Sequence, residues 1–295
     1  MSIDSLTNLL NCAKTRNNYV VGFVVQGWED ASSFVRAADE TETDIILQSG
    51  PGLRKNMPLE LIYAMFEKLS GETNIKIVPH LDHGENYDIC KKALDIGFTS
   101  IMYDGSKLSF KENLNQSLKI YELTQKYNAC LEVELGFVGY NDISKNKKTS
   151  PEEVKLFTDQ LPVTAMAVSV GNTHLQNENS AIIDYDLLRE ISEITSVPLV
   201  IHGGSGVSPI DRIKMSKYYG VRKFNIGTEF RRLFGTILRD ILINDKHIFD
   251  RLEIMQKLKS ALTKKAKKIL LDTNFKYCLL YTSPSPRDLS TSRMP

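Results

Sequence analysis

The chain has 295 residues, which is long for an ordinary single domain but usual for one α/β barrel. Its 37 basic and 36 acidic residues give a formal net charge of +1, which excludes the strong basic excess of proteins that bind nucleic acid or anionic membrane surfaces. No apolar run approaches about 18 residues, so no transmembrane helix is predicted.

Residues 1–19 lack the apolar core of a signal peptide and are typical of a short amphipathic helix. The four cysteines, Cys12, Cys90, Cys130 and Cys278, have no CxxC spacing and fit a reducing compartment. We therefore expect a cytoplasmic protein with neither nucleic-acid nor membrane partners.

Strand-like and helix-like segments then alternate eight times between Tyr19 and Gly227. The predicted strands are residues 19–25, 44–49, 75–82, 99–105, 129–135, 164–170, 198–203 and 222–227. The predicted helices are 28–42, 58–70, 86–96, 110–127, 151–159, 185–195 and 209–219. Eight such units, with no change in composition that would mark a second domain, predict a (β/α)8 TIM barrel with a short N-terminal helix and C-terminal helices.

Three segments need their own interpretation. Pro79 removes a ladder hydrogen bond from the third predicted strand, so we expect either a local bulge or a late start to the pairing. The basic stretch from Lys257 to Lys268 could bind a polyanion, but its Leu and Ala spacing favours one solvated helix face. The stretch from Cys278 to Pro295 resembles a translated sequencing adapter, so we predict a single barrel over 1–277 and a non-native disordered tail over 278–295.

Histidines gather where the predicted strands end, which is where barrel enzymes carry their working residues. His83, His174 and His202 each follow a separate apolar run, and three imidazoles that leave a fourth position open suit a catalytic zinc ion. The alternative is that each is a buried, hydrogen-bonded histidine of the barrel rim. His80 lies within a strand and is interpreted as a core histidine, and His247 has no evident role.

Carboxylates accompany these histidines. Asp82 adjoins His83 and could exchange a proton with a substrate oxygen, or orient a histidine instead. Glu132 and Glu134 point to one face because strand side chains alternate, and inside a barrel they need a cation or donors nearby. Together with Asp104 they could bind a second ion or brace the first.

Two glycine-containing segments follow the last two predicted strands. They are HGGSG from His202 to Gly206 and FNIGTE from Phe224 to Glu229. Barrel enzymes often hold phosphate at this place, where backbone N–H groups face the anion and hydroxyls such as those of Ser205 and Thr228 can add donors. Either segment alone could be an ordinary turn, but together they favour a phosphate site. With the zinc site and the proton-transfer group on the same rim, they predict a phosphorylated carbonyl substrate.

Six motifs occur in a fixed order between Tyr19 and Phe234. They are HLDHG, SIMYDGS, LEVELG, GN-T-H, VIHGGSG and FNIGTE. In this respect the chain resembles the class II, zinc-dependent ketose-bisphosphate aldolases, which include fructose- and tagatose-bisphosphate aldolases. The resemblance implies reversible cleavage of a ketose 1,6-bisphosphate into dihydroxyacetone phosphate and an aldehyde. Zinc would polarise the carbonyl and stabilise the enediolate, and the protein would form a homodimer or homotetramer.

The same resemblance assigns roles to single residues. It implies a zinc ion on His83, His174 and His202, with Asp82 as the acid/base residue. It implies a second divalent ion at Asp104 and Glu134, and a monovalent cation without an assigned site. The implied substrate-binding residues are Ser49, Gly203, Gly204, Ser205, Asn225, Ile226, Gly227 and Thr228.

Three departures from the family pattern favour caution about turnover. Leu175 stands where members carry a glycine, and Val24 or Val25 stands where they carry an asparagine. Asn141 stands in the loop position of a glutamate, and an amide cannot act as a base. The alternative to an active aldolase is therefore a barrel that binds sugar phosphates without turnover. Zinc-dependent hydrolysis is a third hypothesis, which leaves the phosphate loops unexplained.

Overall fold

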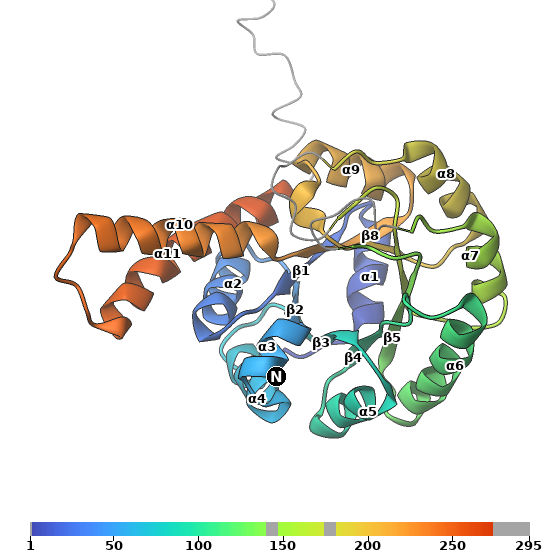
Figure 1. Ribbon diagram of the computed structural model, residues 1–295, viewed down its shortest axis with the longest axis horizontal. Helices are drawn as coiled ribbons and strands as arrows, with labels where there is room; N and C mark the ends of the chain where they lie inside the picture. The colour runs from blue at the N-terminus through green and yellow to red at the C-terminus, as the bar shows by residue number, and fades with distance from the viewer. Residues whose placement is uncertain (1, 140–146, 174–180, 274–295) are drawn as a thin grey trace, which may run out of the picture.

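Eight parallel strands pair in sequence order from β1 to β8, and β8 pairs back with β1, so the sheet closes into a barrel. This arrangement is seen in a computed structural model that describes residues 2–139, 147–173 and 181–273 (Figure 1). The predicted (β/α)8 TIM barrel is confirmed. The strands are β1 (Val20–Val24), β2 (Ile45–Ser49), β3 (Ile77–Gly84), β4 (Ser100–Tyr103), β5 (Cys130–Leu135), β6 (Ala165–Val168), β7 (Leu199–Ile201) and β8 (Val221–Ile226).

Helices cover the outside of the barrel and close one of its ends (Figure 1). They are α1 (Leu6–Thr15), α2 (Trp28–Glu40), α3 (Pro51–Asn56), α4 (Leu59–Ser70), α5 (Tyr87–Ile96), α6 (Phe110–Lys126), α7 (Pro151–Thr158), α8 (Tyr185–Ile194), α9 (Pro209–Tyr218), α10 (Thr228–Asn244) and α11 (Arg251–Asp272). The short helix α3 was not predicted, because six residues carry too little periodicity. The predicted tail, 278–295, lies outside the described residues.

The barrel interior is apolar at its amino end. Leu6, Leu9 and Leu10 of α1 pack there against inward-facing strand residues that include Ile46 and Val78. The hydroxyl of Ser5 caps α1 by accepting a hydrogen bond from the Asn8 N–H at 3.2 Å. The amphipathic N-terminal helix therefore closes the bottom of the barrel.

The outer core lies between the strands and the surrounding helices. Phe23 of β1 stacks on Phe34 of α2 with 4.5 Å between ring centroids, and Phe230 of α10 meets both rings edge-on at 5.5 and 4.6 Å. Aromatic pairs of this kind contribute about 0.5–1.5 kcal/mol each beyond the area they bury. This cluster fixes the start of α10 directly beside the strands that form the mouth of the barrel.

Pro79 is accommodated by a late start to one pairing. β3 pairs with β2 from Ile77 onward and includes Pro79 opposite Leu47. Its pairing with β4 begins only at His80, one residue after the proline. A register shift does occur in β3, but it lies further along the strand, between Leu81 and Gly84.

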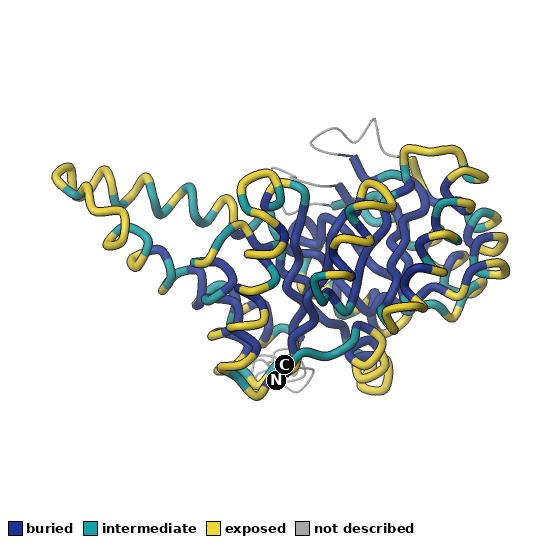
Figure 2. The backbone as a smooth tube through the Cα atoms, turned by 90° about the horizontal axis from the view of Figure 1, so that it is seen from below, coloured by how far each residue is buried: buried dark blue, intermediate teal, exposed yellow. Residues whose placement is uncertain are grey.

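The helices α10 and α11 form an arm that projects from the barrel (Figures 1 and 2). One face of α11 buries Leu258, Leu262 and Ala266 beside α2, which agrees with the predicted helix with one solvated face. At the far end of the arm Phe249 is 93% exposed and Leu252 is 70% exposed. In the part of the chain that the structure describes, no helix is both long and apolar enough to cross a bilayer.

Candidate functional site

A bulge near the end of β3 brings two consecutive side chains to the mouth of the barrel. Leu81 pairs with Ile101 and Gly84 with Tyr103, so β3 contains one residue more than β4 over this stretch. His83 has a φ of 51°, a left-handed conformation that costs a non-glycine residue about 1–3 kcal/mol. In a regular strand Asp82 and His83 would face opposite sides, whereas here both line the same cavity. His83 thus lies within β3 rather than beyond its end.

Two of the three predicted zinc-binding imidazoles meet at this point. The rings of His83 and His202 lie 4.8 Å apart between centroids, at 67° to each other. One potential ligand atom from each of Asp82, His83 and His202 lies within 4.8 Å of the others, and all three residues are buried. His202 directly follows β7, as predicted, and His174 lies outside the described residues.

A carboxylate contacts one ring nitrogen of each of these two imidazoles. The Nδ1 atom of His83 lies 2.7 Å from Asp104 Oδ2, and the Nε2 atom of His202 lies 3.2 Å from Glu132 Oε1. Asp104 is itself held by the backbone N–H and the hydroxyl of Ser106, at 3.1 and 2.6 Å. A carboxylate on one ring nitrogen is the arrangement that orients a metal-binding histidine through its other nitrogen.

Glu134 lies between these two imidazoles. Its Oε1 atom accepts a hydrogen bond from the Val138 N–H at 3.2 Å, and its Oε2 atom lies 3.3 Å from His202 Nδ1. His83, Asp104 and Glu134 also form a second group whose ligand atoms lie within 4.8 Å of one another. The predicted second-ion residues are thus brought together, next to the first group and sharing His83 with it.

The pKa values show that this cluster favours positive charge. Burial alone would lower the pKa of His202, but Glu132 and Glu134 outweigh it and raise the pKa to about 10. Burial likewise opposes the raised pKa of His83, which Asp82 and Asp104 produce. Protons on the imidazoles can supply the positive charge that these carboxylates require, and so can a divalent cation.

A buried ion pair lies directly below. Lys223 of β8 donates to Glu132 Oε2 at 2.6 Å, and both side chains are fully buried. His80 hydrogen-bonds Ser100 at 2.8 Å through Nδ1, and its Nε2 lies 3.5 Å from Lys223 Nζ. Burial lowers the pKa of His80 to about 3, so its ring is neutral, in agreement with its interpretation as a core histidine.

Lys223 is the cation that Glu132 was expected to need, and sequence reasoning missed it. A signal was present, because Lys223 and Asn225 share a face of the eighth strand by alternation. Asn225 in turn donates to Asp82 Oδ1 over 3.4 Å. The same face of β8 therefore contacts both the lower ion pair and the candidate acid/base residue.

A cavity of about 250 Å³ opens above Asp82 and His83. Five predicted substrate-binding residues line it, together with the unpredicted Arg231, Pro51 and two further glycines. Val24 also lines it, whereas Val25 is buried in the core. The lining residues are Val24, Gly50, Pro51, Gly52, Asp82, His83, Gly203, Ser205, Asn225, Gly227, Thr228 and Arg231.

Three predicted substrate-binding residues do not line this cavity. Ser49 is fully buried, and its hydroxyl has no hydrogen-bond partner among the described residues. The side chain of Ile226 lies in the outer core, so only its main chain can face the mouth. At Gly204 a Cβ atom would come within 2.9 Å of the Asn225 carbonyl oxygen, so this glycine permits close packing of the loop on β8.

Ser205 links the loop after β7 to the start of α10. Its hydroxyl accepts hydrogen bonds from the N–H groups of Gly227 and Glu229, at 3.3 Å each. Gly227 is the N-cap of α10 and Glu229 lies in its first turn, where helix N–H groups lack intrahelical partners. The two glycine-containing segments are therefore joined side by side along one wall of the cavity.

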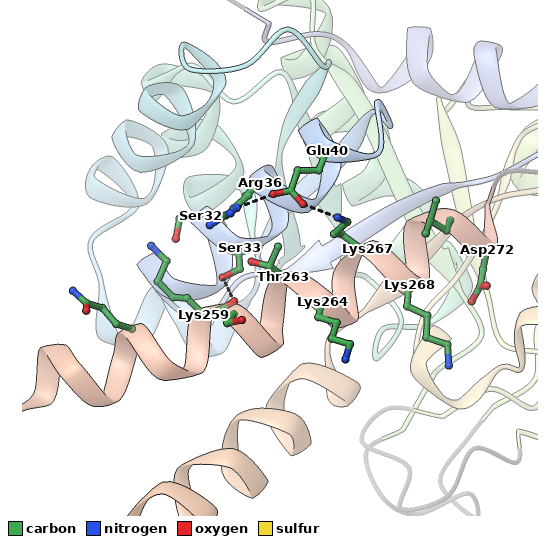
Figure 3. Close-up of a pocket in the computed structure, with 13 residues that line it drawn as sticks. Ser32, Ser33, Arg36, Glu40, Lys259, Thr263, Lys264, Lys267, Lys268 and Asp272 are labelled. Carbon is green, nitrogen blue, oxygen red and sulfur yellow. Dashed lines mark hydrogen bonds and ion pairs between the residues drawn. The ribbon is translucent and has the colours of Figure 1, made fainter. Parts of the chain in front are cut away.

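A larger hollow lies elsewhere, between α2 and α11, with a volume of about 1120 Å³ (Figure 3). Its lining is basic, but Glu40 pairs with Arg36 at 2.8 Å and with Lys267 at 2.7 Å. It contains no histidine or cysteine and lies away from the strand ends. Barrel chemistry depends on strand-end residues, so the smaller cavity at the mouth is the candidate active site.

Comparison with known proteins identifies the family of this chain. The sequence model described as "Fructose-bisphosphate aldolase class-II" matches residues 4–276. The chain is 33% identical to the fructose-bisphosphate aldolase of Mycoplasma genitalium over 249 residues, covering 81% of this chain and 85% of that one. It is 31% identical to the Staphylococcus aureus fructose-bisphosphate aldolase over 258 residues, covering 85% and 90%.

Two solved structures share the fold. The YdjI aldolase of Escherichia coli has a TM-score of 0.79 at 22% identity, covering 92% of this chain and 99% of that one. The fructose-bisphosphate aldolase of Campylobacter jejuni has a TM-score of 0.79 at 20% identity, covering 92% and 96%. At such identities the likeness supports the barrel alone, but the family model spans nearly the whole chain. The chain therefore belongs to the class II fructose-bisphosphate aldolase family.

Proposed function

We propose that this protein is a metal-dependent aldolase that reversibly cleaves a ketose 1,6-bisphosphate of the fructose or tagatose type into dihydroxyacetone phosphate and an aldehyde. The observation that supports it most is the meeting of Asp82, His83 and His202 below a glycine-walled cavity. Neither part alone would indicate this reaction. Together they supply a metal site, a proton-transfer group and a phosphate cradle within one cavity.

The donor set fits a divalent metal ion. His83 and His202 are buried imidazoles with carboxylates on their rear nitrogens, and His174 is proposed as the third ligand. Asp104 then orients His83. It is also proposed, together with Glu134, as a ligand of a second cation. A zinc ion bound there would act as a Lewis acid on the substrate carbonyl.

The protein's own groups then have defined tasks. Asp82 accepts a proton from the substrate hydroxyl during cleavage and returns it during condensation. Gly203, Ser205, Gly227 and Thr228 bind a substrate phosphate through N–H and hydroxyl groups, and the Arg231 guanidinium adds positive charge at the same cavity. These contacts hold the substrate carbon chain over Asp82 and His83.

Metal removal tests the proposal. Protein treated with a chelator should lose cleavage of fructose and tagatose 1,6-bisphosphate by more than about 100-fold and regain it with Zn²⁺. Formation of dihydroxyacetone phosphate in a coupled assay is the measurement. His83→Ala should lose bound zinc, whereas His247→Ala, which changes an exposed histidine in the arm, should retain it. Failure of the zinc-loaded protein to cleave either sugar would contradict the proposal.

The non-catalytic alternative predicts a different result. Leu175 and Asn141, which motivate it, lie outside the described residues. A barrel that only binds sugar phosphates would give a calorimetric binding signal with a ketose bisphosphate but no product with any metal. Zinc-dependent hydrolysis would release inorganic phosphate or another hydrolysis product instead of a triose phosphate.

We further propose that the arm joins copies of this chain into a homodimer or homotetramer. Phe230 is the only buried residue of α10, and Ile243, Phe249 and Leu252 are 68%, 93% and 70% exposed. Apolar side chains gathered at the end of a projecting arm are costly in water unless a partner covers them. Light scattering should therefore give at least twice the chain mass, and a monomer at micromolar concentration would contradict this proposal.

A further inference from the structure

Arg54 makes contacts that its position outside the cavity does not explain. It lies on α3, half-buried, and its guanidinium donates to three main-chain carbonyl oxygens. Nη1 donates to Ser49 O and to Asp82 O, the latter at 2.7 Å, and Nη2 donates to His83 O at 2.8 Å. Arg54 is not among the residues that line the cavity, so it can influence chemistry there only through other groups.

Two of these carbonyls, those of Asp82 and His83, belong to the β3 bulge, and the third ends β2 at Ser49. On one side, the β2 partner ends at Ser49, which pairs with Leu81, so Asp82 and His83 extend past it. On the other side, the register with β4 shifts between Leu81 and Gly84. The ladder towards β4 resumes where the Asp104 N–H donates to Gly84 O at 2.9 Å. The guanidinium therefore supplies hydrogen bonds that a neighbouring strand would supply in a regular sheet.

We propose that Arg54 is a positioning residue, whose planar fork holds the bulged Asp82–His83 backbone so that the carboxylate and the imidazole face the same point. The left-handed His83 is a conformation that persists only when its surroundings impose it. Two donated hydrogen bonds from one rigid group impose it directly, and a third ties the same group to the end of β2. A lysine has one compact ammonium group and cannot reproduce the fork. The expected effect of Arg54 on catalysis rests on the proposed function. Its expected effect on metal affinity does not depend on that function.

The test compares three variants of the full-length protein. Arg54→Met removes the donors at similar side-chain length, and Arg54→Lys keeps the charge. Lys55→Met is the matched control, because it removes an exposed cation from the same short helix. The measurements are the zinc dissociation constant, from competition with a chromophoric chelator, and kcat and KM for fructose and tagatose 1,6-bisphosphate.

For Arg54→Met we expect a zinc dissociation constant raised about 10- to 100-fold and a kcat lowered by a similar factor. KM should change by less than about threefold, because Arg54 does not reach the cavity. Arg54→Lys should give an intermediate loss in both quantities, and Lys55→Met should match the wild type. This split between kcat and KM, with partial rescue by lysine, would not follow from a general loss of stability.

Several outcomes would overturn the inference. One is wild-type zinc affinity and kcat in Arg54→Met; another is a raised KM with unchanged kcat, which would mean that Arg54 binds substrate. Should Arg54→Met fail to fold, Arg54→Lys decides, and wild-type values for that folded variant would overturn the inference. Should the wild type cleave no sugar bisphosphate, the proposed function fails, and the zinc affinities alone still decide the role of Arg54.

Discussion

Replacing Asp82 by asparagine is expected to lower kcat for ketose-bisphosphate cleavage by about 10²–10⁴-fold, the usual contribution of a positioned acid/base group. Asparagine keeps the shape of the side chain and can still accept from Asn225, but it cannot take up a proton. Burial alone would raise the pKa of Asp82, but His83 and His202 lower it. Its carboxylate is therefore ionised at neutral pH and ready to accept a proton.

Zinc content separates this role from that of a ligand. Asp82→Asn should retain about one equivalent of zinc, since the imidazoles remain. Asp88→Asn, at an exposed position in the first turn of α5, is the matched control and should keep the wild-type kcat. Loss of zinc together with activity would make Asp82 a ligand, and retention of full activity would remove it from the mechanism.

Replacing Lys223 by methionine is expected to destabilise the protein by about 3–5 kcal/mol, the usual result of removing one partner of a buried ion pair. Lys223 and Glu132 are fully buried and joined at 2.6 Å. Without the ammonium group the Glu132 carboxylate keeps the His202 imidazolium as its charged partner, in a place that water does not reach. The free energy of unfolding in urea, measured on the metal-free protein, is the quantity to compare.

A second variant distinguishes charge from packing. Lys223→Met combined with Glu132→Leu should recover most of the lost stability, because a buried ion pair replaced by apolar groups is often neutral. It should still bind zinc more weakly, since His202 loses the carboxylate at Nε2. Lys111→Met, on an exposed face of α6, should change stability by less than about 0.5 kcal/mol. A loss below about 1 kcal/mol in Lys223→Met would show that the pair contributes little.

The strand-end residues were predictable because a parallel barrel imposes a rule that local sequence obeys. Each strand that is buried on both faces leaves an apolar run, and its carboxyl end is followed by polar residues. His202, Ser205 and Thr228 were found in this way. Arg54 could not be found from the sequence. It follows β2, whereas its partners at 82 and 83 belong to β3, and no local sequence pattern indicates a hydrogen bond to a carbonyl on another strand.

The amino-acid sequence by itself determined the barrel, the direction of its strands and the residue types at its mouth, since these follow from periodicity and from the order of the segments. Only the tertiary structure decided how those residues meet. The extra residue in β3 turns Asp82 and His83 to one side, Lys223 approaches Glu132 across the barrel, and Val24 rather than Val25 borders the cavity. Each of these contacts depends on the distance between strands that are far apart in the chain. That distance is fixed only when the sheet closes into a barrel.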